Sequence, residues 1–197
     1  VVVENRPGAG GSIGHDVVAK AAADGYTLLF SAAGPLVVTP HTYPTLPYDP
    51  KGFEPISLVS TAPLLLVVNP KLKASTMQDL IAEARASGKM TYGSFGNGSA
   101  AHLAGELFKA TVNVDLVHVP YKGSGQAITD LLGGQVNLNF DTMPPILEHV
   151  RNGKLVALAV STPQRLAQLP GVPTFIEKGI VGFDVTNWYA IMGPKAL

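Results

Sequence analysis

The chain has 197 residues, a length that suits one ordinary domain or two small lobes. Hydrophobic residues make up 46% and charged residues 14%, and this composition excludes intrinsic disorder. Fourteen basic residues balance fourteen acidic ones, so no overall field would draw the chain to nucleic acid. The absence of cysteine excludes disulfides and thiolate metal sites. No apolar run reaches the roughly 18 residues that a membrane-spanning helix needs.

The first third of the chain predicts short elements separated by tight turns, because glycine and proline are frequent there. The chain opens without methionine in a strand-like run, so we expect a truncation at this end, which could have removed a leader. The expected elements are a buried strand at Val1–Val3, a helix at Ser12–Ala23, a strand at Tyr26–Ser31, a loop at 32–35, a proline-rich irregular stretch at 40–55 and an extended segment at Ile56–Asn69.

The rest of the chain alternates helices and strands. A helix from Ser75 or Thr76 to Ser87 has Gln78 and Asp79 placed for a capping box and Gly88 as its stop. The elements that follow are strands at Met90–Ser94, Val114–Val119, Val136–Phe140 and Leu155–Val160, helices at Ser99–Ala110, Gln126–Leu132 and Pro144–Asn152, and an extended run at Phe183–Met192. This alternation predicts an α/β fold with a parallel sheet, and the unbroken apolar strands predict helices on both faces.

The loop Gly93–Ser99 joins a strand to a helix, with Ser99 placed as the helix cap. The first amides of such a helix lack internal partners, so they form an anion site. The alternative is a tight turn with a helix cap and no ligand. A nucleotide-hydrolysing P-loop is excluded, because the expected lysine is replaced by Ser99.

Two glycine patterns suggest an NAD(P)-dependent oxidoreductase as the alternative function. Gly96–Ala101 satisfies G-x-G-x-x-[GA], but Asp115 stands at the wrong end of the next strand to bind a ribose. The loop Gly8–Gly14 is similar to that of short-chain dehydrogenases, yet the strand after it ends without an acidic residue. We therefore expect no cofactor.

Catalytic and metal-binding patterns are absent from the sequence. There is no G-x-S-x-G elbow and no His-Glu-x-x-His, and the five histidines lack metal-ligand spacing. His102, in the first turn of a helix, is either a ligand contact or a partly buried histidine bonded to backbone. These observations favour a binding protein over an enzyme.

Several motifs in order resemble the Bug family of periplasmic solute receptors, the substrate-binding components of tripartite tricarboxylate transporters. They cover essentially the whole chain. These motifs are Val3–Gly14, Asp24–Leu29, Ser94–Leu103, His118–Gly123 and Leu131–Val136.

The resemblance implies a two-lobed, type II periplasmic-binding-protein fold with a mostly parallel sheet in each lobe. The first lobe is expected at 1–66 with 187–197, and the second at 67–186. Family members are longer, so we expect truncation at both ends and a missing first loop that supplies part of the site. The implied protein is a periplasmic monomer that captures a small carboxylate and passes it to membrane components of a transporter. The resemblance implies an amino acid, a di- or tricarboxylate or an aromatic acid as the ligand, and the sequence does not rank these three classes.

The expected ligand contacts lie at strand ends and in the glycine loop. Asp141 is expected either to accept from a ligand amine or hydroxyl or, preferably, to cap the next helix; Lys122 is either a ligand contact or a solvated charge. The loop residues that would hold the carboxylate are Ser94, Gly96, Asn97, Gly98 and Ser99, with His102 nearby; Tyr121, Lys122 and Gly123 would flank the ligand, Asp141 and Thr142 follow a strand, and Ala33 and Gly34 would present first-lobe backbone.

Overall fold

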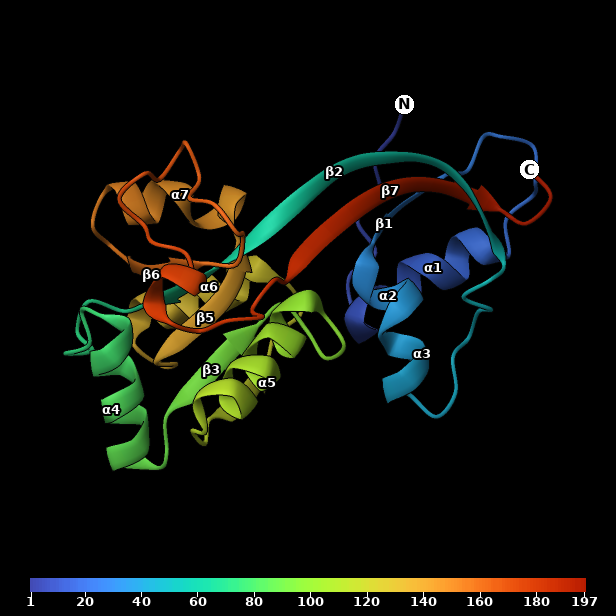
Figure 1. Ribbon diagram of the computed structural model, residues 1–197. Helices are drawn as coiled ribbons and strands as arrows, with labels where there is room; N and C mark the ends of the chain where they lie inside the picture. The colour runs from blue at the N-terminus through green and yellow to red at the C-terminus, as the bar shows by residue number, and fades with distance from the viewer.

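The structure is a computed structural model that describes residues 1–197. It has two lobes, and two long strands, β2 (Phe53–Val68) and β7 (Thr186–Pro194), arch side by side from one lobe toward the other (Figure 1). The strands pair antiparallel over most of their length. The two lobes are therefore joined by a hydrogen-bonded ribbon, whose ends lie on either side of the junction.

The first lobe contains short helices that pack beneath the ribbon (Figure 1). Its remaining elements are the 3-10 turn η1 (Ala9–Gly11), helix α1 (Ser12–Ala19), strand β1 (Leu29–Ala32) and helices α2 (Ala33–Val37) and α3 (Thr39–Thr42).

The second lobe contains the longer helices. Its elements are α4 (Met77–Ser87), β3 (Thr91–Ser94), α5 (Ala100–Val112), β4 (Val117–Pro120), α6 (Ser124–Gly133), β5 (Leu138–Thr142), α7 (Met143–Arg151), β6 (Val156–Val160) and the 3-10 turn η2 (Ile176–Lys178).

Strand β2 belongs to both lobes, because its partner changes along its length. Residues up to Pro63 pair with β7, whereas Leu64 to Val68 pair with β5 on one side and Leu65 to Val68 pair with β6 on the other. The change of partner lies between Pro63 and Leu64, and β7 begins at Thr186. The predicted lobe limits are 1–66 with 187–197 for the first lobe and 67–186 for the second. They lie close to this crossing and stay a prediction.

The sheet is mixed, so the predicted mostly parallel sheet in each lobe is wrong in strand direction. Parallel pairing joins β3 to β4 and to β5. Every pairing that β1, β2, β6 and β7 make with another strand of the sheet is antiparallel. A helix between two successive strands favours parallel pairing of those strands. The long strands β2 and β7, however, come from distant parts of the chain and run antiparallel to the strands that they pair with.

Alternate residues of β2 face opposite helical layers, which explains its unbroken apolar sequence. Leu64, Leu66 and Val68 pack in the core that includes residues of α4 and α5, while Leu65 and Val67 pack in the core that includes residues of α6 and α7. All five are fully buried. The prediction of helices on both faces is confirmed for this lobe.

Local signals located most helices well. Thr76 and Asp79 exchange the two hydrogen bonds of a capping box, and Gly88 ends α4 in a left-handed conformation, as predicted. Other predictions are wrong: Val1–Val3 is exposed and pairs with no strand, the stretch predicted as a loop at 32–35 begins α2, and the helix predicted to reach Ala23 ends at Ala19. A proline in the first turn of a helix is tolerated, because its missing N–H would have no partner there.

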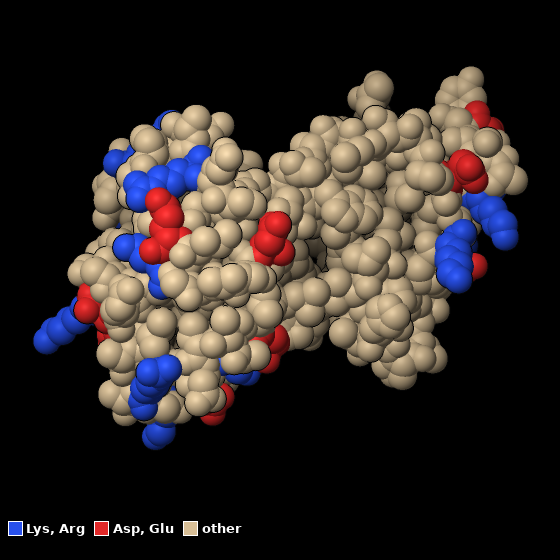
Figure 2. Space-filling view, in the orientation of Figure 1, with Lys and Arg blue, Asp and Glu red and all other residues tan.

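The first lobe has a small core, and the charges on its surface are unevenly placed. Its buried cluster contains Val18, Leu29, Tyr48 and Phe53. Charged side chains gather over the second lobe and at the far end of the first, and the surface over the arched strands is almost free of them (Figure 2). None of the helices combines the length and apolarity required to cross a bilayer.

Candidate functional site

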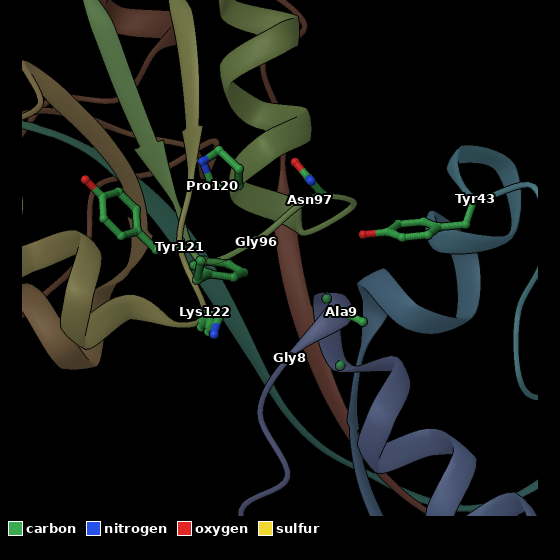
Figure 3. Close-up of a pocket in the computed structure, with 11 residues that line it drawn as sticks. Gly8, Ala9, Tyr43, Gly96, Asn97, Pro120, Tyr121 and Lys122 are labelled. Carbon is green, nitrogen blue, oxygen red and sulfur yellow. The ribbon is translucent and has the colours of Figure 1, made fainter.

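A cavity of about 200 Å³ lies where the two lobes meet. Figure 3 shows that its walls come from both lobes, with the Tyr43 ring projecting from the first lobe toward the loop that carries Asn97. The lining residues are Gly8, Ala9, Gly10, Gly11, Tyr43, Phe95, Gly96, Asn97, Pro120, Tyr121 and Lys122.

Glycines allow the lobes to approach closely beside this cavity. A Cβ added at Gly10 would lie 2.6 Å from the carbonyl oxygen of Asn97, and one at Gly34 would lie 2.8 Å from that of Gly98. Both distances are shorter than a side chain tolerates. The absence of a side chain at these positions therefore brings first-lobe backbone against the 96–98 loop.

Several backbone amides around the cavity have no acceptor within the protein. They belong to Ala9 and Gly10 in the first lobe and to Phe95 and Asn97 in the second. Lys122 is the only charged residue in the lining, it is exposed, and it forms no ion pair. Free N–H donors and an ammonium group suit an anion, because each of them presents positive charge to the cavity.

The helix start predicted as the carboxylate seat uses its polar groups internally. The Ser99 hydroxyl donates to the Gly96 carbonyl (2.6 Å) and accepts from the His102 amide (3.3 Å), so it caps α5 as predicted. The Ser99 amide also donates to the Gly96 carbonyl, at 3.2 Å. Ser94 is fully buried, and its hydroxyl donates to the Gly96 carbonyl and accepts from the Gly96 amide. These groups shape the loop, and the free amides that line the cavity lie before the helix.

Two histidines support the same loop from behind. The Gly98 amide donates to Nδ1 of His102 at 3.2 Å, so the predicted backbone-bonded role of this histidine is the one observed. Nε2 of His118 lies 2.7 Å from the Ser94 hydroxyl. Burial lowers the pKa of both rings, that of His118 to about 4. Both imidazoles are therefore neutral at pH 7.

Residues 120–122 form the third wall of the cavity. Tyr121 donates its hydroxyl hydrogen bond to Asp130 at 2.7 Å, and burial together with that bond raises its pKa to about 12. Lys122 lines the cavity, as expected of a ligand contact, whereas Gly123 precedes α6 outside the lining with a positive φ of 152°.

Asp141 lies away from the cavity lining and is fully buried at the end of β5. It accepts from the Ser124 hydroxyl and the Thr142 amide, both at 2.8 Å, and from Asn139 at 3.3 Å. The predicted capping role is wrong, since α7 begins after Thr142 without a side-chain cap. Burial raises the pKa of Asp141 to about 6.

Of the predicted site residues, Gly96, Asn97, Tyr121 and Lys122 line the cavity. The ligand contacts expected of the others stay a prediction. They lie behind the loop, beside the lobe contact or at the far strand end: Ala33, Gly34, Ser94, Gly98, Ser99, His102, Gly123, Asp141 and Thr142.

The sequence interpretation assigned no ligand contact to the first-lobe loop Gly8–Gly11, nor to Tyr43, Phe95 and Pro120. The glycine run Gly8–Gly11 resembles a dehydrogenase loop and is part of the family motif Val3–Gly14, but neither pattern assigns it a ligand contact. His15 anchors this loop: its Nδ1 lies 2.9 Å from the Gly11 carbonyl, and its Nε2 lies 2.8 Å from the Ser31 hydroxyl. No group of three side chains is arranged to hold a metal ion.

Two lobes joined by paired strands, with free amides around the cavity between them, are the architecture of the periplasmic-binding-protein fold. The chain belongs to the tripartite tricarboxylate transporter family receptors, whose family model matches residues 1–197. The predicted Bug family and two-lobed type II fold are confirmed, and the matching family is one of receptors, in agreement with the prediction of a binding protein over an enzyme.

The chain aligns with its relatives over nearly its whole length, and those of known structure have the same fold. The chain is 46% identical to BugT of Bordetella pertussis, covering 99% of this chain and 61% of that protein. It is 36% identical to the periplasmic binding protein BugD (TM-score 0.94) and 36% identical to the R. palustris protein Rpa4515 with adipate (TM-score 0.96). Each alignment covers 99% of this chain and 66% of the solved one. The chain thus spans about three fifths of BugT.

Proposed function

We propose that this protein is a periplasmic receptor that captures a small carboxylate between its lobes for a tripartite tricarboxylate transporter. The single observation that carries this proposal is the set of unpaired amides at Ala9, Gly10, Phe95 and Asn97 around a cavity whose only charge is Lys122. Donors from both lobes would bind one carboxylate together, so binding and lobe closure support each other.

The family and its relatives support the carboxylate class. Rpa4515 was solved with adipate, and it shares this fold over 99% of the present chain. A cavity of about 200 Å³ has room for a small acid. Reversible capture suits the chemistry of the walls, since backbone donors and an exposed ammonium bind an anion without reacting with it.

A thermal-shift panel tests the proposal. It contains one compound of each class: adipate, citrate, benzoate and glutamate, with NADPH as the competing oxidoreductase ligand. At a hundredfold excess over Kd, a bound acid stabilises the native state by about 2.7 kcal/mol. We expect at least one acid to raise Tm and NADPH to have no effect. A shift with NADPH alone, accompanied by enhanced nicotinamide fluorescence, would reverse the assignment.

Lys122→Gln is expected to weaken binding of the acid found in that panel about threefold to tenfold, since an exposed ammonium near a carboxylate contributes on the order of 1 kcal/mol. The difference from wild type should shrink as salt is raised, because salt screens exposed charges. Calorimetry at low and high salt measures both effects.

Lys154→Gln is the matched control, because Lys154 is also exposed and lies outside the cavity lining. If both variants lose the same affinity, the effect of Lys122 is one of overall charge and not of the site.

A further inference from the structure

Three aromatic side chains are stacked behind the 94–98 loop. The ring of His102 stacks on that of His118, with centroids 4.1 Å apart and planes 12° from parallel. Tyr92 stacks on the other side of His118 at 4.8 Å. The column thus connects α5, β4 and β3 directly beneath the loop that faces the first lobe.

The two histidines hold the two ends of that loop. His118 bonds to Ser94 at its start, and His102 bonds to Gly98 at its end. Between these anchors lie Phe95 and Asn97, which supply the unpaired amides of the second lobe. Whatever fixes the anchors therefore fixes the orientation of the donors.

The anchors differ in how they respond to protonation. Nε2 of His118 can donate to the Ser94 hydroxyl, so a protonated His118 can keep its bond. Nδ1 of His102 accepts from the Gly98 amide, which requires a lone pair that protonation removes. Protonation of His102 would also set a cation 4.1 Å from the His118 ring centroid.

The charged groups around His102 are few. Glu106 and Lys109 lie on its own helix and pair with each other at 3.0 Å, and Tyr92 donates a hydrogen bond to Glu106 at 2.6 Å. His118 faces it from β4. Burial, the largest influence, lowers the pKa of His102, and the Glu106 charge opposes this. The Glu106 carboxylate, which could favour protonation of His102, is therefore already engaged by Lys109 and Tyr92.

The first-lobe loop has the opposite arrangement. There Nδ1 of His15 meets the carbonyl oxygen of Gly11, an acceptor that a protonated ring can still satisfy. Of the two glycine loops, the one in the second lobe alone depends on a histidine lone pair.

We propose that His102 is a positioning residue of the carboxylate site: its neutral ring aims the Phe95 and Asn97 amides at the cavity, and its protonation loosens the loop, so that the carboxylate is released as pH falls. The release step rests on the proposed function, while the coupling of His102 to the loop does not.

The first test follows the loop without any ligand. NMR titration from about pH 7.5 to about pH 4.5, a range that spans the ordinary histidine pKa, should show the Gly98 amide and the His102 ring changing together in wild type. His102→Gln supplies a carbonyl acceptor that does not titrate, and it should remove the transition at Gly98. A Gly98 amide that is insensitive to pH in wild type, or that still titrates in His102→Gln, would overturn the proposal.

The second test measures adipate binding by calorimetry at about pH 7.5 and about pH 5, either side of the ordinary histidine pKa. Adipate takes up protons itself over this range, and that loss is common to all variants. Beyond it, wild type should lose about tenfold in affinity on acidification, and His102→Gln should lose nothing further. His102→Leu, which leaves the Gly98 amide unpaired, should bind about tenfold more weakly at both pH values.

His149→Gln on α7 is the matched control and should behave as wild type. Equal acid losses in wild type and His102→Gln overturn the release step and leave the proposed function intact. If no acid of the panel binds at neutral pH, the proposed function fails instead, and the Gly98 titration still decides whether His102 controls the loop.

Discussion

Gly34→Ala is expected to weaken carboxylate binding on the order of a hundredfold without destabilising the protein. The added methyl group would lie 2.8 Å from the Gly98 carbonyl oxygen and 3.4 Å from the Ser99 Cα, both of them backbone atoms of the opposite lobe. The lobes would have to separate to accommodate it. An apparent Kd rises in proportion as the binding-competent state becomes rare, so closure made a hundredfold rarer gives this loss.

The stability measurement distinguishes blocked closure from misfolding. Gly34 lies in α2 without a positive φ, and alanine is favoured over glycine in a helix by up to about 1 kcal/mol. Tm should therefore stay equal or rise. Gly125→Ala, at the second residue of α6, is the matched control, because its Cβ would meet nothing within 4 Å. Unchanged affinity in Gly34→Ala would show that the observed approach of the lobes is not needed for binding.

Asp141→Asn is expected to raise the free energy of unfolding at pH 7 by about 2–3 kcal/mol. Asp141 is fully buried, has no cationic partner, and its pKa is raised to about 6 by burial. A folded pKa above the unfolded value means that the neutral acid stabilises the fold below about pH 4, and that this contribution is lost as pH rises through about 6. Asparagine stays neutral throughout.

The hydrogen bonds of Asp141 can be kept in this variant. The amide oxygen of asparagine can accept from Ser124 and Thr142, and its NH₂ group can donate to Oδ1 of Asn139, now without a partner, once the Asn139 amide turns over. Denaturant unfolding of both proteins from about pH 4 to about pH 8 measures the effect.

The stability gain should disappear near pH 4. Burial also lowers the pKa of His118, to about 4. Acidification below the ordinary histidine pKa therefore destabilises wild type and variant equally, and this contribution cancels in the difference between their free energies of unfolding. A variant less stable than wild type at pH 7 would contradict the assignment.

Local signals in the sequence predicted the features that depend on a few neighbouring residues. The capping box at Thr76 and Asp79 and the cap at Ser99 are each complete within four positions, and both are confirmed. Strand direction was not predictable in this way. The helix-and-strand alternation says nothing of β7, which returns from the end of the chain to pair with β1 and β2.

The sequence also predicted the part of the site that depends on neighbouring elements of one lobe. Gly96, Asn97, Tyr121 and Lys122 line the cavity, because loops after neighbouring parallel strands meet at one sheet edge. The contribution of Gly8–Gly11 requires the lobes to be placed against each other, which no local pattern encodes. Nor does the sequence show that Ser94 is engaged by a histidine 24 positions away.

The charge of the ligand is the central claim of this account, and calorimetry can test it directly. The acid that most raises Tm is compared with its amide, which has the same skeleton without the negative charge. Hydrogen bonds to a charged group contribute about 1.5–3 kcal/mol, so we predict that the amide binds about tenfold to a hundredfold more weakly. Equal affinities for the acid and the amide would contradict the assignment of the free amides and Lys122 as a carboxylate site.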